Sequence, residues 1–299
     1  MRRAHMTTHL LSFALVDVFT STPLSGNSLS VFLLDTELST RAMQRITVEM
    51  RQFESIFLRR IGDSNHFDTR IFTMQEELAF AGHPIIGAGA VLHAQLWPND
   101  RAVTIGFAIG GRLITTIARR EGAASLVEMD QGCASFGADV PTDRYDALLR
   151  ALNLSPQDRA PGLPMQVIST GLAYLIVPVR SGLDQARIAN DNFEALLAQV
   201  GAKFVYVFDV ERREGRTWDN VGLVEDIATG SAAGPTGAFL VAHGLATRDE
   251  FFVLRQGRLV GRPSELYVKV VGASKFSITV RGQVCPVGGG ALTLPSESL

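Results

Sequence analysis

ELAFAGHPIIGAGAVL, residues 77–92, and EDIATGSAAGPTGAFL, residues 225–240, are the two stretches that decide the expected fold. Each begins with an acidic residue, passes through a polar glycine turn and continues into a run of small and apolar residues. A proline near the start of each run suits the first turn of a helix, where a missing N–H loses no hydrogen bond. Each stretch therefore predicts a turn that opens a buried helix, over 84–96 and over 232–243.

Gly82 and Gly230, the glycines of these turns, lie about half of the 299-residue chain apart. An ordinary helix start is the simpler explanation for either turn alone. Two such turns in matching places of two halves, however, predict two similar domains that face each other across a cleft. A helix N-terminus offers unpaired N–H groups and the positive end of the helix dipole, so it favours carboxylates. The pair therefore indicates an anion site, with Gly82, Gly230 and Ser231 as candidate binding residues.

Composition narrows the class of protein. A hydrophobic share of 46% and a charged share of 19% are typical of a globular chain. The formal charge of −2 gives no electrostatic reason to expect nucleic acid or an anionic membrane as a partner. Cys133 and Cys285 fit neither a metal spacing nor a disulfide framework; we expect buried free thiols, with a single bridge left open. The basic start, residues 1–6, leads to no signal-peptide cleavage site, so we expect a cytoplasmic protein.

The remaining segments predict short strands, rich in β-branched and aromatic residues. Those over 103–107, 112–119 and 125–129 follow one another closely and indicate an antiparallel meander. The second half repeats the plan, with a strand expected near 218–223 just before the second glycine turn. The sequence thus predicts an α+β fold of two β-rich halves, each with one buried central helix.

Glu54 lies among Phe53, Ile56 and Phe57 at the start of an expected strand. Apolar surroundings disfavour the charged form of a carboxyl group, which suits it to proton transfer near neutral pH. A strand glutamate that points outward by simple alternation is the competing explanation from local sequence.

No metal-binding pattern, no GxGxxG and no GxSxG elbow occurs in a suitable context, so we expect no metal, no nucleotide and no serine nucleophile. The remaining candidates are Glu54, His83 and Asp226, with the backbone amides at the two glycine turns. A base, a second proton-handling group and an anion cradle are what proton transfer beside a carboxylate requires. We therefore expect chemistry without a cofactor.

At these residues the chain resembles the phenazine biosynthesis PhzF family. The matching segments are 16–19, 26–27, 53–57, 70–73, 81–84, 226–232, 256–257 and 261–264. The match runs nearly end to end, and the order of its segments is specific.

The resemblance implies a diaminopimelate epimerase-like fold of two pseudo-symmetric domains, 1–132 and 133–288, each wrapped around a central helix. The C-terminal strand 289–299 is a candidate for closing the first domain. It further implies a site in the cleft between the domains, a homodimer, and a small carboxylate substrate. The founding activity is the isomerisation of trans-2,3-dihydro-3-hydroxyanthranilate.

The same resemblance assigns roles to single residues. Glu54 is implied as the base that removes and returns a proton, with His83 and Asp226 assisting as further catalytic residues. Asn27 joins the residues of the two glycine turns as a candidate for substrate binding. The epimerase branch of this fold uses two cysteines at the paired helix starts, and their absence here disfavours a two-thiol epimerase.

Three departures from the family pattern concern Phe53, Ser28 and Met74, where serine, proline and proline are usual. Phe53 matters most, since it replaces a hydroxyl beside Glu54 by a bulky ring and points to a different substrate. We hypothesise a cofactor-independent isomerase that shifts a double bond in a small unsaturated amino or carboxylic acid of secondary metabolism. An amino-acid epimerase or racemase, and a non-catalytic carboxylate-binding protein, stay open as alternatives.

Overall fold

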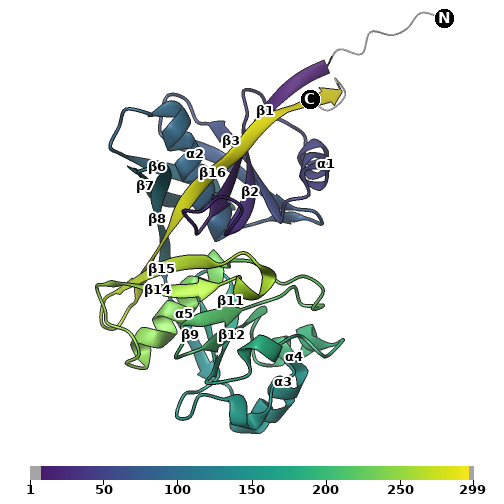
Figure 1. Ribbon diagram of the computed structural model, residues 1–299, viewed down its shortest axis with the longest axis vertical. Coiled ribbons are helices and arrows are strands. Elements are labelled where there is room, and N and C mark those ends of the chain that lie inside the picture. The colour runs from purple at the N-terminus through teal and green to yellow at the C-terminus, as the bar shows by residue number, and fades with distance from the viewer. Residues whose placement is uncertain (1–7, 296–299) are drawn as a thin grey trace, which may run out of the picture. The chain divides into compact units, whose positions relative to one another are not determined.

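The computed structural model describes residues 8–295 and divides into two compact units (Figure 1). Unit 1 contains residues 8–129 and 282–295, and unit 2 contains residues 130–281. The expected domain limits, 1–132 and 133–288, stay a prediction. The basic start, 1–6, and the last part of the expected closing strand, 296–299, lie outside the described residues.

Unit 1 is a sheet with one helix on each face. Its strands are β1 (Thr8–Val18), β2 (Asn27–Leu33), β3 (Glu54–Arg60), β4 (His66–Thr73), β5 (Glu77–Leu78), β6 (Ala102–Ile109), β7 (Arg112–Glu121), β8 (Ala124–Cys133) and the later part of β16 (Ser277–Pro295). Neighbours follow the order β16-β1-β2-β3-β4-β6-β7-β8, and β5 adds to β4. The pairs β2–β3 and β4–β6 are parallel, whereas β6, β7 and β8 form the expected antiparallel meander.

Helix α2 (Gly82–Leu96) is buried along its first twelve residues and contacts β1, β2, β3, β6 and β7. Its small residues permit this close packing. A Cβ atom on Gly87 would lie 2.5 Å from Leu29 and 2.9 Å from Val18, which are both fully buried. The glycine therefore lets the helix approach the surface formed by β1 and β2.

Helix α1 (Thr40–Met50) covers a second hydrophobic cluster of unit 1. Ser39 caps it, accepting a hydrogen bond from the Ala42 amide. The rings of Phe32 and Phe57, on adjacent strands, stack at 4.8 Å beneath this helix. Successive side chains along a strand point to opposite faces of the sheet. The residues directly before and after each phenylalanine therefore face the other side, where α2 lies.

Unit 2 has a sheet of its own. Its strands are β9 (Ser135–Asp139), β10 (Gln166–Ser169), β11 (Ala173–Val179), β12 (Phe204–Asp209), β13 (Glu214–Arg216), β14 (Phe251–Gln256), β15 (Ser264–Val271) and the start of β16, in the order β16-β15-β14-β13-β12-β11-β10-β9. Helix α5 (Gly230–Ala242) is buried over most of its length and contacts β10, β11 and β15. Helices α3 (Tyr145–Ala151) and α4 (Phe193–Gln199) pack on a cluster that includes Val205 and Val207 of β12.

Three local expectations need correction. Both buried helices begin two residues earlier than expected, so Gly82 and Gly230 are their first residues. Pro235 lies inside α5 instead of in its first turn, and it cannot donate the helical bond to the Ser231 carbonyl. The expected strand near 218–223 is wrong, because the Asp219 carboxylate accepts the amide hydrogens of Leu223 and Val224 and closes a turn there.

Candidate active site

Glu54 and His83 meet in the interior of unit 1. Glu54 is the first residue of β3 and His83 the second of α2, and their side chains are 8% and 5% exposed. Oε2 of Glu54 lies 3.3 Å from Nδ1 of His83. Glu54 pairs in register with Leu29, which contacts α2, so strand pairing places it on the same face. The outward-pointing alternative for Glu54 is therefore wrong.

Asn27 joins this pair from the start of β2. Its side chain is fully buried, and its Nδ2 lies 3.4 Å from Nδ1 of His83. Gly26 just before it has a φ of +66°, and a Cβ there would lie 2.4 Å from the Val18 carbonyl oxygen. Glycine at this position thus permits the turn that brings Asn27 to the imidazole.

Burial lowers the pKa of His83 from its ordinary 6.5 to about 3, because the charged imidazole would lose its hydration. The ring is consequently neutral at physiological pH, and its contact with Glu54 is not a pair of opposite charges. A neutral Nδ1 either donates a proton or accepts one, depending on the tautomer. Glu54 and His83 are thus placed to hold one proton between them.

The other predicted residues lie in unit 2, where Asp226 precedes α5. The Asp226 amide donates to the Thr217 carbonyl at 3.0 Å, and the Thr229 hydroxyl donates to Asp226 Oδ2 at 2.5 Å. Because that hydroxyl is engaged with Asp226, Thr229 gives α5 no side-chain cap. Within residues 8–295, no hydrogen bond satisfies the amide N–H groups of Gly230 and Ser231.

Ser231 also offers a hydroxyl, which lies 2.7 Å from the hydroxyl of Tyr174 on β11. Gln131 packs on the first turn of α5, and its Nε2 donates to the Gly230 carbonyl at 2.9 Å. Glycine at position 234 leaves room for this side chain, since a Cβ there would overlap Gln131. The start of α5 therefore presents backbone donors of the kind that bind anions at helix N-termini.

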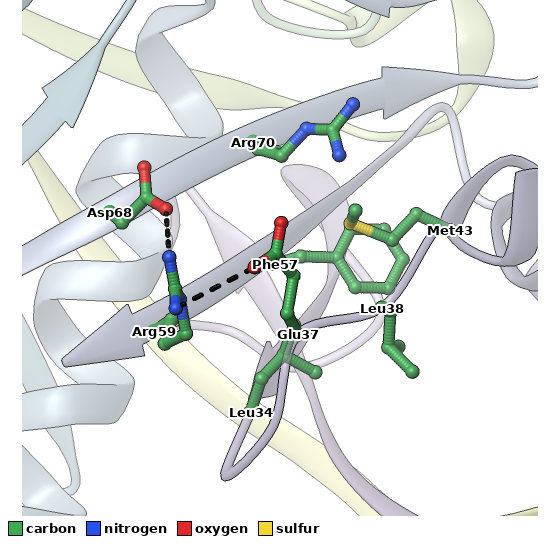
Figure 2. A pocket seen from close by; sticks show the side chains of 8 residues that line it. All are labelled: Leu34, Glu37, Leu38, Met43, Phe57, Arg59, Asp68 and Arg70. Atoms are coloured by element: carbon green, nitrogen blue, oxygen red, sulfur yellow. Dashed lines mark hydrogen bonds and ion pairs between the residues drawn. The ribbon is translucent and has the colours of Figure 1, made fainter. Parts of the chain in front are cut away.

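The pocket of Figure 2 is a different feature of unit 1. It is lined by Leu34, Glu37, Leu38, Met43, Phe57, Arg59, Asp68 and Arg70 and has a volume of about 30 Å³, room for about one water. At this pocket Arg59 forms ion pairs with Asp68 at 3.1 Å and with Glu37 at 3.8 Å. The Arg70 side chain points away from the pocket and binds Glu77. The pocket contains none of the predicted site residues.

Comparison with known proteins identifies the family. The model of a family described as "Phenazine biosynthesis-like protein" matches residues 16–290. The chain belongs to this family.

Members of the phenazine biosynthesis-like family include named isomerases. The trans-2,3-dihydro-3-hydroxyanthranilate isomerase of Pseudomonas aeruginosa is 31% identical over 88% of this chain and 91% of its own length. The uncharacterized isomerase YddE of Escherichia coli O157:H7 is 32% identical, over 85% of this chain and 88% of its own length. The chain is accordingly an isomerase of the PhzF type.

Solved structures show the fold of the PhzF family. A Pseudomonas aeruginosa protein described as a predicted epimerase is 47% identical, with a TM-score of 0.88 over 94% of this chain and 99% of that one. A hydroxyproline epimerase of Agrobacterium vitis, at 13% identity, matches 99% of this chain and 95% of that one with a TM-score of 0.66. The strand-rich fold is thus epimerase-like.

The sequence did not single out three residues that shape the PhzF-type candidate site: Thr229, Tyr174 and Gln131. Thr229 carried a weak signal, as a threonine immediately before a helix. Tyr174 and Gln131 reach the start of α5 from strands distant in sequence, and nothing local marks them.

No helix within residues 8–295 has the length and apolar character that crossing a membrane demands.

Proposed function

We propose that this PhzF-type isomerase works without a cofactor and shifts a double bond in a small unsaturated amino or carboxylic acid. Glu54 removes a proton from one carbon, the electron pair moves along the conjugated system, and the same carboxyl group returns the proton to another carbon. The buried contact of 3.3 Å between Glu54 and the neutral imidazole of His83 is the observation that carries this proposal.

The roles of the other residues follow from their chemistry. His83 and Asn27 hold the Glu54 carboxyl group in place, and the neutral His83 hydrogen-bonds it both as carboxylate and as acid. In unit 2 the N–H groups of Gly230 and Ser231 bind the substrate carboxylate, which the positive end of α5 favours. Asp226 is proposed as a further catalytic group, and Gly82 as a donor of its amide hydrogen to substrate.

We also propose that α2 and α5 are corresponding central helices of two pseudo-symmetric halves. Both begin with glycine, both lack a side-chain cap, and both are buried along most of their length within their own unit. A cytoplasmic homodimer that acts in secondary metabolism is part of the same proposal, and the likeness to the named isomerases supports it.

An experiment in D2O separates this function from its alternatives. The protein is incubated with trans-2,3-dihydro-3-hydroxyanthranilate and with a panel of unsaturated and saturated amino acids, and deuterium is located by NMR. Deuterium at a new carbon of a rearranged product supports the double-bond shift. Deuterium at the original carbon, with inverted chirality, would instead establish an epimerase. Binding without exchange across the panel would favour a carboxylate-binding protein.

The epimerase alternative has one observation in its favour, the solved structure at 47% identity that is described as a predicted epimerase. A two-base epimerase needs a proton donor and an acceptor on opposite faces of one carbon. Both cysteines are free thiols, but the expected burial is wrong for Cys133, which is exposed on β8, and right for Cys285 on β16. Neither is at the start of α2 or α5. The double-bond shift, which needs one base, agrees better with the buried Glu54 carboxyl group acting alone at the carbon.

A further inference from the structure

A buried amide, that of Gln256, organises the segment before α5. Gln256 is the last residue of β14 and only 1% exposed. Its Nε2 donates to the Asp226 carbonyl at 2.8 Å and to the Thr229 hydroxyl at 3.0 Å. Its Oε1 accepts the Thr229 amide hydrogen at 3.0 Å and the Tyr206 hydroxyl at 3.1 Å. Both ends of the side-chain amide bond the segment 226–229, and its oxygen also accepts from Tyr206 on β12.

Hydrogen bonds with backbone groups determine which end of the Gln256 side-chain amide is the NH2 group and which is the oxygen. A flipped Gln256 would set its NH2 group against the Thr229 N–H and its oxygen against the Asp226 carbonyl. Both contacts would then be repulsive. The orientation with Nε2 toward Asp226 is therefore the one that the chain supports.

Tyr206 adds to this constraint from β12. Burial raises the pKa of the Tyr206 phenol, so the group keeps its proton and remains a donor toward Gln256. Its ring lies against Gly215, where a Cβ would come within 2.2 Å. The Gln256 carbonyl oxygen consequently has two fixed donors.

This arrangement sets the direction of the next hydrogen bond. Thr229 Oγ1 accepts from Gln256 Nε2, so the hydroxyl hydrogen of Thr229 is turned toward Asp226 Oδ2, 2.5 Å away. A hydroxyl that is held as a donor fixes the rotamer of the carboxylate that accepts from it. The backbone of the segment is held as well, because Arg216 binds the Glu225 carboxylate through two of its nitrogens and the Asp226 amide donates to Thr217.

We infer that Gln256 and Thr229 are positioning residues that aim the Asp226 carboxylate for catalysis. The inference rests on the proposed catalytic role of Asp226 and extends it to the donors that hold it. Neither residue is proposed to touch the substrate. Gln256 acts on Thr229, Thr229 acts on Asp226, and no covalent step is involved.

The test is a double-mutant cycle on kcat, with trans-2,3-dihydro-3-hydroxyanthranilate as substrate. Thr229→Val removes the hydroxyl with little change of shape, and Thr229→Ser keeps it. Loss of a hydrogen bond to a charged group predicts a fall in kcat of about ten-fold or more for Thr229→Val, with KM nearly constant. Gln256→Met should do the same, and Thr229→Ser should recover most of the rate.

Thr236→Val is the matched control. Thr236 is a buried threonine within α5, and its hydroxyl donates to the Ala232 carbonyl of the same helix. The Thr236→Val variant should lose about as much stability as Thr229→Val, whereas its kcat should stay within about two-fold of the wild-type value. In an Asp226→Ala background, Thr229→Val should cost almost nothing further, because it acts through the carboxylate that has been removed.

Crystal structures of the variants give an answer that needs no substrate. In Thr229→Val the Asp226 side chain should adopt another rotamer or several, whereas in Thr236→Val it should stay in place. An unchanged Asp226 orientation, or an equal rate loss from Thr229→Val in both backgrounds, would overturn the inference. Wild-type turnover by Asp226→Ala would instead contradict the proposed role of Asp226 itself, so the two failures can be told apart.

Discussion

Nδ1 of His83 lies 3.3 Å from Oε2 of Glu54, although the two residues belong to different elements and neither side chain is more than 8% exposed. A neutral imidazole can hydrogen-bond a buried carboxyl group in both of its protonation states, since Nδ1 donates to the carboxylate in one tautomer and accepts from the carboxylic acid in the other. Both side chains are held by the starts of ordered elements, β3 and α2, so their separation is a property of the folded unit.

Burial of His83 makes the stability of the protein depend on pH. The folded-state pKa of about 3 lies below the ordinary 6.5, so between these values the unfolded chain binds a proton that the folded chain does not. The free energy of unfolding should therefore fall as the pH is lowered from about 6.5 toward about 3, by a few kcal/mol at most.

Urea titrations at a series of pH values check this expectation. His83→Gln should flatten the dependence across this window. Ile86→Val, at a buried position on the same helix, should cost about 0.5–1.5 kcal/mol at every pH. An equally steep pH dependence in His83→Gln and in the wild type would show that another group is responsible.

Gly87 should resist substitution although alanine favours helices by about 1 kcal/mol. The new Cβ would lie 2.5 Å from Leu29 and 2.9 Å from Val18, and overpacking of such a core costs about 1–3 kcal/mol. Gly89→Ala is the control on the same helix, since its nearest neighbours would be 3.1 Å and 3.2 Å away. Denaturant midpoints should fall clearly for Gly87→Ala and much less for Gly89→Ala; the reverse order would contradict the packing described for α2.

Gly26→Ala should reduce both stability and activity. The residue has a φ of +66°, and the added Cβ would lie 2.4 Å from the Val18 carbonyl oxygen, so the turn that delivers Asn27 must shift. Gly62→Ala serves as the control, because its φ is +57° but the space around it is open. The control should cost about 1–2 kcal/mol and leave kcat unchanged. A Gly26→Ala variant with wild-type turnover would show that the placement of Asn27 is unimportant.

Much of the fold was predictable because its signals are local. The small, apolar runs after Gly82 and Gly230 pack closely only as buried helices, and both helices are present. The start of α5 and the interior position of Pro235 were missed, since tertiary packing holds a helix through a residue that would otherwise interrupt it. The strand expected near 218–223 failed because the side chain of Asp219 competes for the backbone.

The candidate site was predictable only in part, and for a similar reason. Glu54 and His83 stand in local patterns that suggest chemistry, and the structure brings them together with Asn27. Gln256 lies in a segment that matches the family, 256–257, but the sequence suggested no role for it, since its contacts are with Asp226 and Thr229, about thirty residues earlier in the chain. Hydrogen bonds between distant segments depend on the register of β14 in its sheet, which local sequence does not encode.

The most direct test compares the wild type with Glu54→Gln and Glu77→Gln in D2O. Glutamine keeps the size of the buried side chain but cannot carry a proton, so Glu54→Gln should fold normally and lose at least about 100-fold in kcat. Glu77→Gln disturbs only the ion pair with Arg70 at the surface of unit 1 and should exchange deuterium at the wild-type rate. Deuterium incorporation at a new carbon by the wild type and by Glu77→Gln, but not by Glu54→Gln, is the predicted result; full turnover by Glu54→Gln would contradict the account.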